Sequence, residues 1–183
     1  MQFETFDIGR VILRLLTPEH YKYIFSHYTN DELKGFLGVS SDEALQIERN
    51  KSDKGFTAYN RSMRLFQVID KVSGRVIGAC GLHNWYADHR RSEIGYHMMD
   101  ESFKNKGIMS EVLAFVVNYG FTVMHLHRIE ALIGTQNMPS QKLVKKLNFK
   151  QEGLLKEHYF VNSRFEDSMV FALLKSEYSI NNE

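Results

Sequence analysis

Residues 103–124 read FKNKGIMSEVLAFVVNYGFTVM, a glycine between lysines directly before a long apolar pattern. The apolar spacing predicts a helix of about 27 Å from Gly107 to about Met124. The first turn of a helix carries unpartnered backbone N–H groups and partial positive charge. Gly107 has no Cβ, so these amides can approach an anion closely, and Lys104 and Lys106 add positive charge. The stretch therefore predicts a site for a ligand that carries a pyrophosphate.

A simpler interpretation is that Gly107 is a turn residue and that the lysines form a solvated surface. The stretch is not a P-loop, which requires Gly-x-x-x-x-Gly-Lys-Ser/Thr, nor a dinucleotide-binding Gly-x-Gly-x-x-Gly. A strand predicted at residues 92–99 precedes the helix, however, and a strand leading to a helix N-terminus suits phosphate binding. The residues around this stretch are therefore needed to distinguish a phosphate site from a solvated turn.

The rest of the chain mixes strands and helices without repeats or low-complexity tracts. Strands are predicted at residues 11–16, 65–69, 75–80, 92–99, 128–133, 153–159 and 165–174. Helices are predicted at residues 18–28, from about 41, at 107–124 and at 138–147, and Pro18 and Pro139 both fall at helix starts. We expect hairpins around Gly74 and residues 162–163. This order predicts an α/β (α+β) fold, one sheet flanked by helices, in a single domain of residues 1–183.

Composition excludes several classes of function. The chain of 183 residues has a net charge of +1, so it offers no general electrostatic field for nucleic acid or a membrane. Its single cysteine, Cys80, excludes an internal disulfide and a zinc site with several thiolates. We see no secretory apolar segment behind Met1 and no apolar run near the ~20 residues that span a bilayer. We expect a cytoplasmic protein.

Short motifs run through the second half of the chain, and each is weak alone. They are SEIGY at 92–96, KGIMSE at 106–111, YGF at 119–121, HRIEA at 127–131, NMPS at 137–140, KLNF at 146–149 and EG at 152–153. As a set they resemble the GCN5-related N-acetyltransferases (GNAT), most of all the branch of RimJ/RimL-type ribosomal-protein N-terminal acetyltransferases. The resemblance extends from RVILR at 10–14 to LLKSEY at 173–178.

The resemblance implies a mixed, mostly antiparallel sheet with a central parallel pair, at 93–99 and 128–134, that splays to hold the pantetheine arm of acetyl-CoA. Backbone groups of His97, Met98 and Met99 would pair with that arm. The loop that would cradle the pyrophosphate comprises Lys104, Asn105, Lys106, Gly107, Ile108, Met109 and Ser110. The family loop usually reads Gln/Arg-x-x-Gly-x-Gly/Ala, whereas lysine stands first here and methionine last. Lysine still meets phosphate as a point charge.

Acetyl transfer to an amine requires a neutral nucleophile, a stabilised oxyanion and help for the departing thiolate. The resemblance places Glu93 near the incoming amine as its base, directly or through water. The alternative is a structural glutamate paired with Arg90, Arg91 or Arg128. A backbone N–H near His97 would meet the oxyanion.

The remaining site residues are also implied by the resemblance. Asn137 is placed as a helix N-cap and also toward the pantetheine. Ser140 would bind the cofactor and donate to the thiolate, or be only a helix-start hydroxyl. Tyr159 is the second candidate acid and substrate contact, although an aromatic residue on a strand is more often core. Trp85 and Tyr86, before the 92–99 strand, would lie with Glu93 at the substrate mouth.

The leading hypothesis is an acetyl-CoA-dependent N-acetyltransferase that acts on a protein N-terminal α-amine. An acetyltransferase for polyamines or amino sugars is the alternative, because carboxylates at 31–32 and 42–43 leave a cationic acceptor open. A non-catalytic acyl-CoA-binding module is the third hypothesis, which the retained Glu93, Asn137 and Ser140 oppose. We expect no metal, since the eight histidines show no metal-ligand spacing, and no direct nucleic-acid partner. A homodimer is left open.

Overall fold

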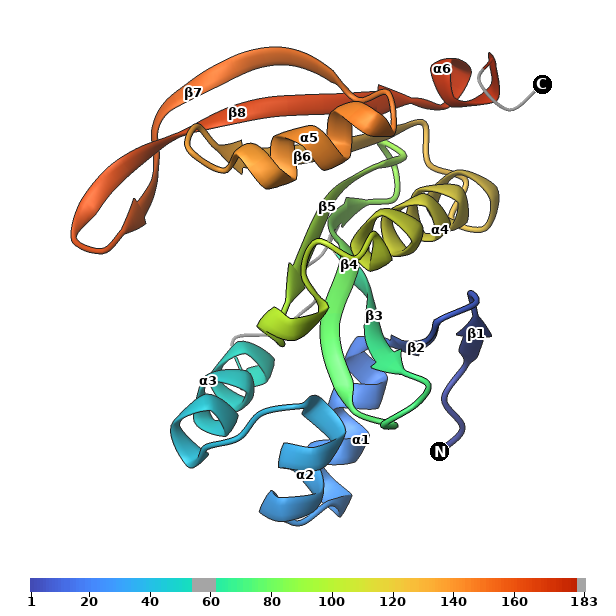
Figure 1. Ribbon diagram of the computed structural model, residues 1–183, viewed down its shortest axis with the longest axis vertical. Coiled ribbons are helices and arrows are strands. Elements are labelled where there is room, and N and C mark those ends of the chain that lie inside the picture. Colours follow the sequence, from blue (N-terminus) through green and yellow to red (C-terminus); the bar gives the residue numbers. More distant parts are fainter. Residues whose placement is uncertain (54–61, 181–183) are drawn as a thin grey trace.

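The computed structural model describes residues 1–53 and 62–180, which form one eight-stranded sheet with helices on both faces (Figure 1). The strand order is β1-β2-β3-β4-β5-β6-β8-β7. The strands are β1 (Thr5–Asp7), β2 (Val11–Leu16), β3 (Ser62–Asp70), β4 (Val76–Tyr86), β5 (Arg91–Met98), β6 (Arg128–Gly134), β7 (Lys150–Val161) and β8 (Arg164–Leu174). The helices are α1 (Pro18–His27), α2 (Asn30–Leu37), α3 (Asp42–Asp53), α4 (Ile108–Thr122), α5 (Met138–Lys146) and α6 (Lys175–Ile180), with a 3₁₀ turn, η1, at Glu101–Phe103.

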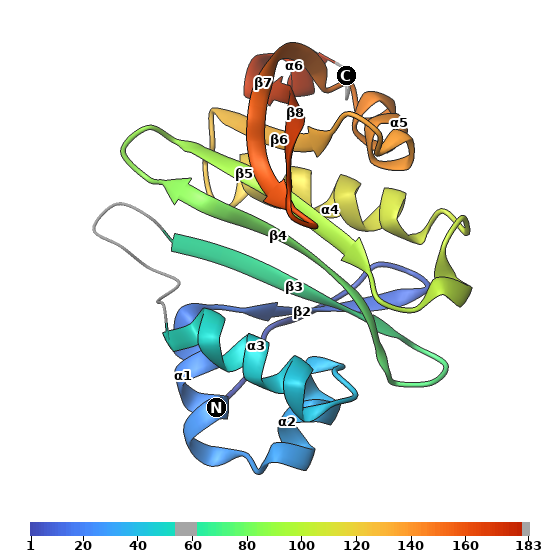
Figure 2. The same cartoon turned by 90° about the vertical axis from the view of Figure 1, so that its left-hand side faces the viewer.

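Every neighbouring pair of strands is antiparallel except β5 and β6, which run parallel at the centre. Their pairing is short, from Arg91 opposite Arg128 to Glu93 opposite Glu130. Beyond that point β5 stays paired with β4 and β6 stays paired with β8, so the two strands diverge (Figure 2). The expected mixed sheet with a splayed parallel pair is confirmed.

Two hydrophobic clusters hold the helices on opposite faces of the sheet. The larger cluster packs α4 against the central strands and includes Phe66, Val116 and Ile129. The smaller cluster joins α1, α2 and α3 to the other face and includes Ile24 and Leu45. Figures 1 and 2 show the two groups of helices on either side of the strands. In the described part of the chain, no helix has both the length and the apolar character to cross a bilayer.

Local signals explain where the helices begin. Pro18 is the first residue of α1, and Pro139 lies in the first turn of α5, as predicted. The Asn137 side chain accepts a hydrogen bond from the Ser140 backbone N–H at 3.2 Å, which confirms it as the N-cap of α5. α4 starts after Gly107, which has a φ of 79°, a left-handed conformation that favours glycine.

Several elements were not expected from the sequence. They are β1, α2, η1 and α6. β1 is a three-residue strand that exists by pairing with β2, and α2 is an eight-residue helix that begins with a Thr29–Glu32 capping box. The hairpin around Gly74 joins β3 to β4 inside the sheet, not at its end. Short elements are hard to predict because distant contacts stabilise them.

The close packing of α4 on the sheet predicts a cost for enlarging Gly120. A Cβ there would lie 2.9 Å from Ile129 Cδ1 and 3.1 Å from Leu82 Cδ1, and both neighbours are fully buried. Gly120→Val should lower the free energy of unfolding by about 1–3 kcal/mol, because overpacking shifts side chains that have no free space. Urea denaturation monitored by circular dichroism measures the change.

The matched control is Gly35→Ala in α2, where a Cβ would have no neighbour within 4 Å. It should raise stability by about 0.5–1 kcal/mol, since alanine is the better helix former. If Gly120→Val were as stable as the parent, the close approach of α4 to the sheet would be wrong.

Candidate active site

A cavity of about 640 Å³ opens where β5 and β6 diverge, between the end of β5, the start of α4 and α5. Its lining residues are Tyr96, His97, Met98, Phe103, Lys104, Asn105, Gly107, Ile108, Met109, Ser110, Asn137, Pro139, Ser140, Lys142, Leu143 and Lys146. Ten of the twelve predicted cofactor residues therefore come together in one cavity. Met99 and Lys106 are outside the lining, and the Met99 backbone N–H donates to the Ile77 carbonyl at 2.8 Å.

The N-terminus of α4 faces this cavity through Gly107, Ile108, Met109 and Ser110. The Gly107 carbonyl accepts the first helical bond, from the Ser110 N–H at 3.0 Å. The N–H groups of Ile108 and Met109 come before Ser110 in the first turn, where a helix offers them no internal partner, so they are available to an anion. The helix start that the sequence predicted as an anion site therefore borders this cavity.

Three residues that sequence reasoning missed support this anion site. Arg10, directly before β2, donates to the Lys106 carbonyl at 2.9 Å and binds Glu111 at 2.6 Å. It therefore links the loop before α4 to the first turn of that helix. Lys142 and Lys146, one helical turn apart on α5, line the cavity opposite. Their i, i+4 spacing behind Asn137 was a usable signal for a positive wall. These lysines and Lys104 fit the phosphates of a coenzyme A molecule.

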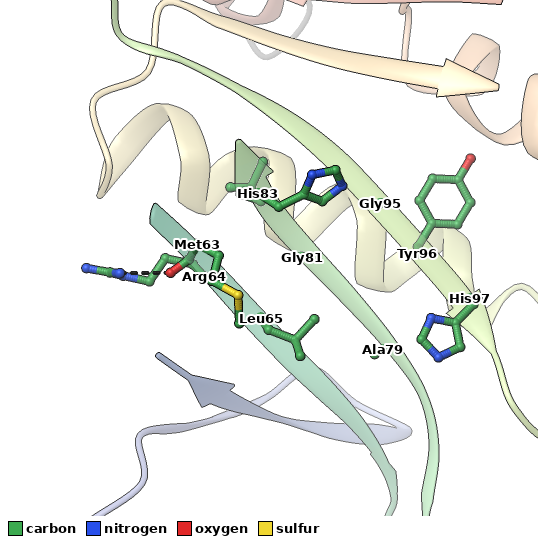
Figure 3. Close-up of a pocket in the computed structure, with 10 residues that line it drawn as sticks. Met63, Arg64, Leu65, Ala79, Gly81, His83, Gly95, Tyr96 and His97 are labelled. Carbon is green, nitrogen blue, oxygen red and sulfur yellow. Dashed lines mark hydrogen bonds between the residues drawn. The ribbon is translucent and has the colours of Figure 1, made fainter. Parts of the chain in front are cut away.

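A second cavity, of about 260 Å³, is hollowed into the face of the sheet that carries α1–α3 (Figure 3). Its lining residues are Met63, Arg64, Leu65, Ala79, Gly81, Leu82, His83, Gly95, Tyr96 and His97. Gly81 and Gly95 are directly opposite each other on β4 and β5, so the sheet has no side chain at its centre there. Tyr96 and His97 line both cavities, so the two meet at β5.

Tyr96 bridges the opening between β5 and α5. Its hydroxyl donates to the Ser140 carbonyl at 3.2 Å, and burial raises its pKa, which keeps the hydroxyl protonated. His97 is beside it on β5. Although part of its ring is exposed, desolvation by the surrounding protein lowers its pKa, with the charge of Lys51 as a further cause. The imidazole is therefore neutral at pH 7.

Glu93 lies on β5 with its side chain only 14% exposed. Its carboxylate accepts a hydrogen bond from Asn84 Nδ2 at 3.0 Å and lies 3.8 Å from His83 Nδ1. Arg91 and Arg128 bind Glu130 instead, at 3.2 and 2.7 Å, and Arg90 Nε donates to the His125 carbonyl at 3.0 Å. The alternative of a structural glutamate paired with one of these arginines is therefore not what the structure shows.

Tyr159 lies on β7, beyond an irregularity in the β7–β8 pairing between Leu155 and Tyr159. Its side chain is exposed, which contradicts the alternative that it belongs to the core. Desolvation and then the charge of Glu93 raise its pKa, so the phenol lies within electrostatic reach of that carboxylate. The bulge matters because an extra residue re-aims the side chains that follow it.

Trp85 and Tyr86 end β4 and are half-buried. Trp85 packs against the larger core cluster with the Arg64 guanidinium over its ring, and the Arg91 guanidinium lies 4.2 Å from the ring centre of Tyr86. Neither aromatic lines the 260 Å³ cavity.

Comparison with known proteins shows the family. Residues 10–150 match the model described as an acetyltransferase (GNAT) domain. The Bacillus subtilis (strain 168) protein YoaA, named an uncharacterized N-acetyltransferase, is 31% identical over 174 residues, which cover 94% of this chain and 98% of YoaA. YdaF of the same bacterium, named a putative ribosomal N-acetyltransferase, is 30% identical over 105 residues, 57% of each chain.

Among solved structures, the spermidine N-acetyltransferase from Vibrio cholerae in complex with CoA and spermine has a TM-score of 0.66. It is 24% identical and covers 93% of this chain and 98% of its own, so it shares the fold. The domain match and the similarity to YoaA along almost the whole chain agree with the splayed sheet and its cavity. The protein belongs to the GNAT family of acetyltransferases and is an acetyl-CoA-dependent N-acetyltransferase.

Proposed function

We propose that this enzyme acetylates the α-amino group at the N-terminus of a protein or peptide, as its RimJ/RimL-like motifs imply. The chemistry of the 260 Å³ cavity carries the proposal. Its charged or chargeable basic side chains are Arg64, His83 and His97, and its described lining includes no carboxylate. A polyamine has several positive charges, which an apolar cavity with an arginine opposes. An N-terminal residue brings one amine on a neutral backbone.

The carboxylates that left a cationic acceptor open have other partners in the structure. Lys34 Nζ binds Asp42 at 2.8 Å and Asp31 at 3.5 Å. Glu32 caps α2 by accepting from the Thr29 N–H at 2.8 Å. Contacts of this kind reduce the negative potential available to a polyamine. They favour the α-amine over the cationic acceptor.

The printed names of similar proteins support both acceptors. YdaF, a putative ribosomal N-acetyltransferase, supports a protein N-terminus. The shared fold of the Vibrio cholerae spermidine N-acetyltransferase is the observation that favours a polyamine as the second candidate. The third hypothesis, a non-catalytic module, is not retained because the family assignment makes the chain an enzyme.

The residues of the 640 Å³ cavity are proposed to hold acetyl-CoA. The first turn of α4 and the lysines at 104, 142 and 146 would bind the phosphates, while Asn137 and the backbone of His97 and Met98 would bind the pantetheine. A backbone N–H of His97 or Met98 would meet the oxyanion, and Ser140 would donate to the thiolate. Glu93 would take the proton from the amine, directly or through water. Tyr159 remains the second candidate acid.

The proposed phosphate cradle predicts that Gly107→Val weakens acetyl-CoA binding by at least tenfold. Valine at a φ of 79° is strained, and its branched side chain would keep the α4 amides away from a phosphate. Isothermal titration calorimetry with acetyl-CoA measures the change. Gly74→Val is the control, because Gly74 has a φ of 67° with open space in the β3–β4 turn. Equal binding by Gly107→Val and the parent would remove this loop from the cradle.

The proposed role of Ser140 predicts a change in kcat. Ser140→Ala leaves the backbone carbonyl that Tyr96 binds and the N–H that Asn137 caps. The variant should lower kcat more than it raises the acetyl-CoA KM, because charge on sulfur develops mainly after the ground state. Steady-state assays of thiol release give both constants. A change in KM alone would assign the hydroxyl to binding.

The acceptor class predicts the pH dependence of Glu93→Gln. An α-amino group has a reference pKa near ~7.8 and a lysine or polyamine amine near ~10.4, so neutralising the latter costs roughly 3.5 kcal/mol more. With an α-amine acceptor, kcat/KM of Glu93→Gln should fall modestly at pH 7 and approach the parent by about pH 9. With a polyamine the loss should persist. The measurement is kcat/KM against pH, and unchanged activity throughout would remove Glu93 from the mechanism.

A further inference from the structure

The imidazole of His83 occupies the floor of the 260 Å³ cavity. His83 is opposite Glu93 in the β4–β5 register, and Gly95 is the next residue on the same face of β5. A Cβ on Gly95 would lie 2.8 Å from His83 Nε2, so the ring rests on the space that this glycine leaves. Figure 3 shows the ring between β4 and β5, beside Gly95. The side chain is 42% exposed, so a ligand in the cavity can reach it.

The backbone around His83 is held in an unusual geometry. The β4–β5 pairing is irregular between His83 and Tyr86, and Asn84 has a φ of 48° in this bulge. The Ser92 hydroxyl donates to the His83 carbonyl at 2.7 Å. From this bulge, Asn84 Nδ2 donates a hydrogen bond to the Glu93 carboxylate at 3.0 Å. Bulges and left-handed non-glycine residues commonly re-aim side chains at functional sites.

The two imidazole nitrogens face different groups. Nδ1 lies 3.8 Å from the Glu93 carboxylate, and Nε2 points over Gly95 on the cavity floor. Glu93 itself is not among the residues that line the cavity, whereas His83 is. A distance of 3.8 Å suits an ion pair with a protonated ring, and such contacts often tighten only when the substrate is bound. His83 thus both lines the cavity and lies beside the carboxylate.

We propose that His83 is the group that accepts the proton of the acceptor amine, and that Glu93 acts through it as a positioning residue. The inference rests on the proposed function and replaces the water considered there. The acceptor ammonium gives one proton to His83 Nε2, and the Glu93 carboxylate stabilises the imidazolium. The neutral amine then forms the C–N bond while the C–S bond breaks. The amine's second proton goes to the departing thiolate, and His83 returns its proton to solvent.

The neighbouring charges are consistent with this assignment. Arg64 lines the same cavity but cannot act as a base, because a guanidinium remains protonated in proteins. His97 lies at the junction of the cavities, and the charged groups that act on it, Lys51 and Glu48, come from α3. Only His83 has a carboxylate of β5 beside one nitrogen and the cavity beside the other, among the described lining residues.

The test compares kcat/KM for His83→Gln, Glu93→Gln, the double variant and the parent, with a peptide that has a free N-terminus. His83→Gln should lose roughly five- to tenfold in kcat/KM at pH 7 and approach the parent by about pH 9, because an α-amine with a pKa near ~7.8 is then neutral without a base, while its affinity for CoA in calorimetry stays within about threefold of the parent. The double variant should be no slower than His83→Gln, because residues that act as a unit are not additive. His27→Gln, an exposed histidine on α1, is the matched control and should keep full activity.

A second variant keeps the test decisive if His83→Gln does not fold. His83→Ala leaves space for free imidazole, which should restore activity if the role is proton transfer and have no effect if the role is structural. Loss of less than threefold in a folded His83→Gln, additive losses in the double variant, or no rescue of a folded His83→Ala would each overturn the inference. A parent that acetylates no amine would instead overturn the proposed function.

Discussion

The separation of β5 from β6 is the constraint on which the rest of the structure depends. The two strands pair only as far as Glu93 and Glu130 and then follow different neighbours, β4 on one side and β8 on the other. Each strand is held by a full antiparallel ladder on its outer edge, so the inner edges can part without loss of the sheet. Backbone groups along the inner edge are then available to a ligand. An extended arm such as pantetheine can satisfy them.

The opening positions two helix starts around one space. α4 follows β5, and α5 follows β6, so the divergence of the strands separates the N-termini that contribute to the 640 Å³ cavity. The anchor of α4 is its buried face, where Gly120 allows contact with Ile129. The Tyr96 hydroxyl links β5 to the Ser140 carbonyl across the gap. Positive charge gathers at this cavity, because the N-terminus of α4 and the lysines of α5 both border it.

On the opposite face of the sheet, the 260 Å³ cavity exists because two facing residues have no side chains. Gly81 opposite Gly95 leaves a hollow that larger residues would fill, and His83, two residues after Gly81 on the same face of β4, lies over Gly95. Among the described lining residues, the two cavities share Tyr96 and His97, so an acceptor and a thioester would approach β5 from opposite sides. Such an arrangement would bring the amine to the carbonyl carbon without competition for space.

Much of this protein could be predicted from its sequence, because the signals are local. Apolar spacing behind Gly107 predicted α4, the prolines predicted helix starts, and Asn137 was recognisable as an N-cap. The motif set led to the family and to most residues of the 640 Å³ cavity. β1 and α2 escaped detection because they are short and depend on contacts with distant strands and helices.

The surroundings of Glu93 were decided by tertiary structure. In the sequence, arginines lie close enough to Glu93 to be its partners. In the folded sheet, however, Arg91 and Arg128 bind Glu130, and His83 and Asn84 lie beside Glu93. Tyr159 is exposed because β7 is an edge strand that is exposed along almost its whole length. Register and bulges depend on which strands meet, and a shift of one residue turns every side chain to the other face. The sequence by itself therefore determined the family, most of the elements and the residues gathered at the start of α4, while only strand pairing decided which side chains lie beside Glu93.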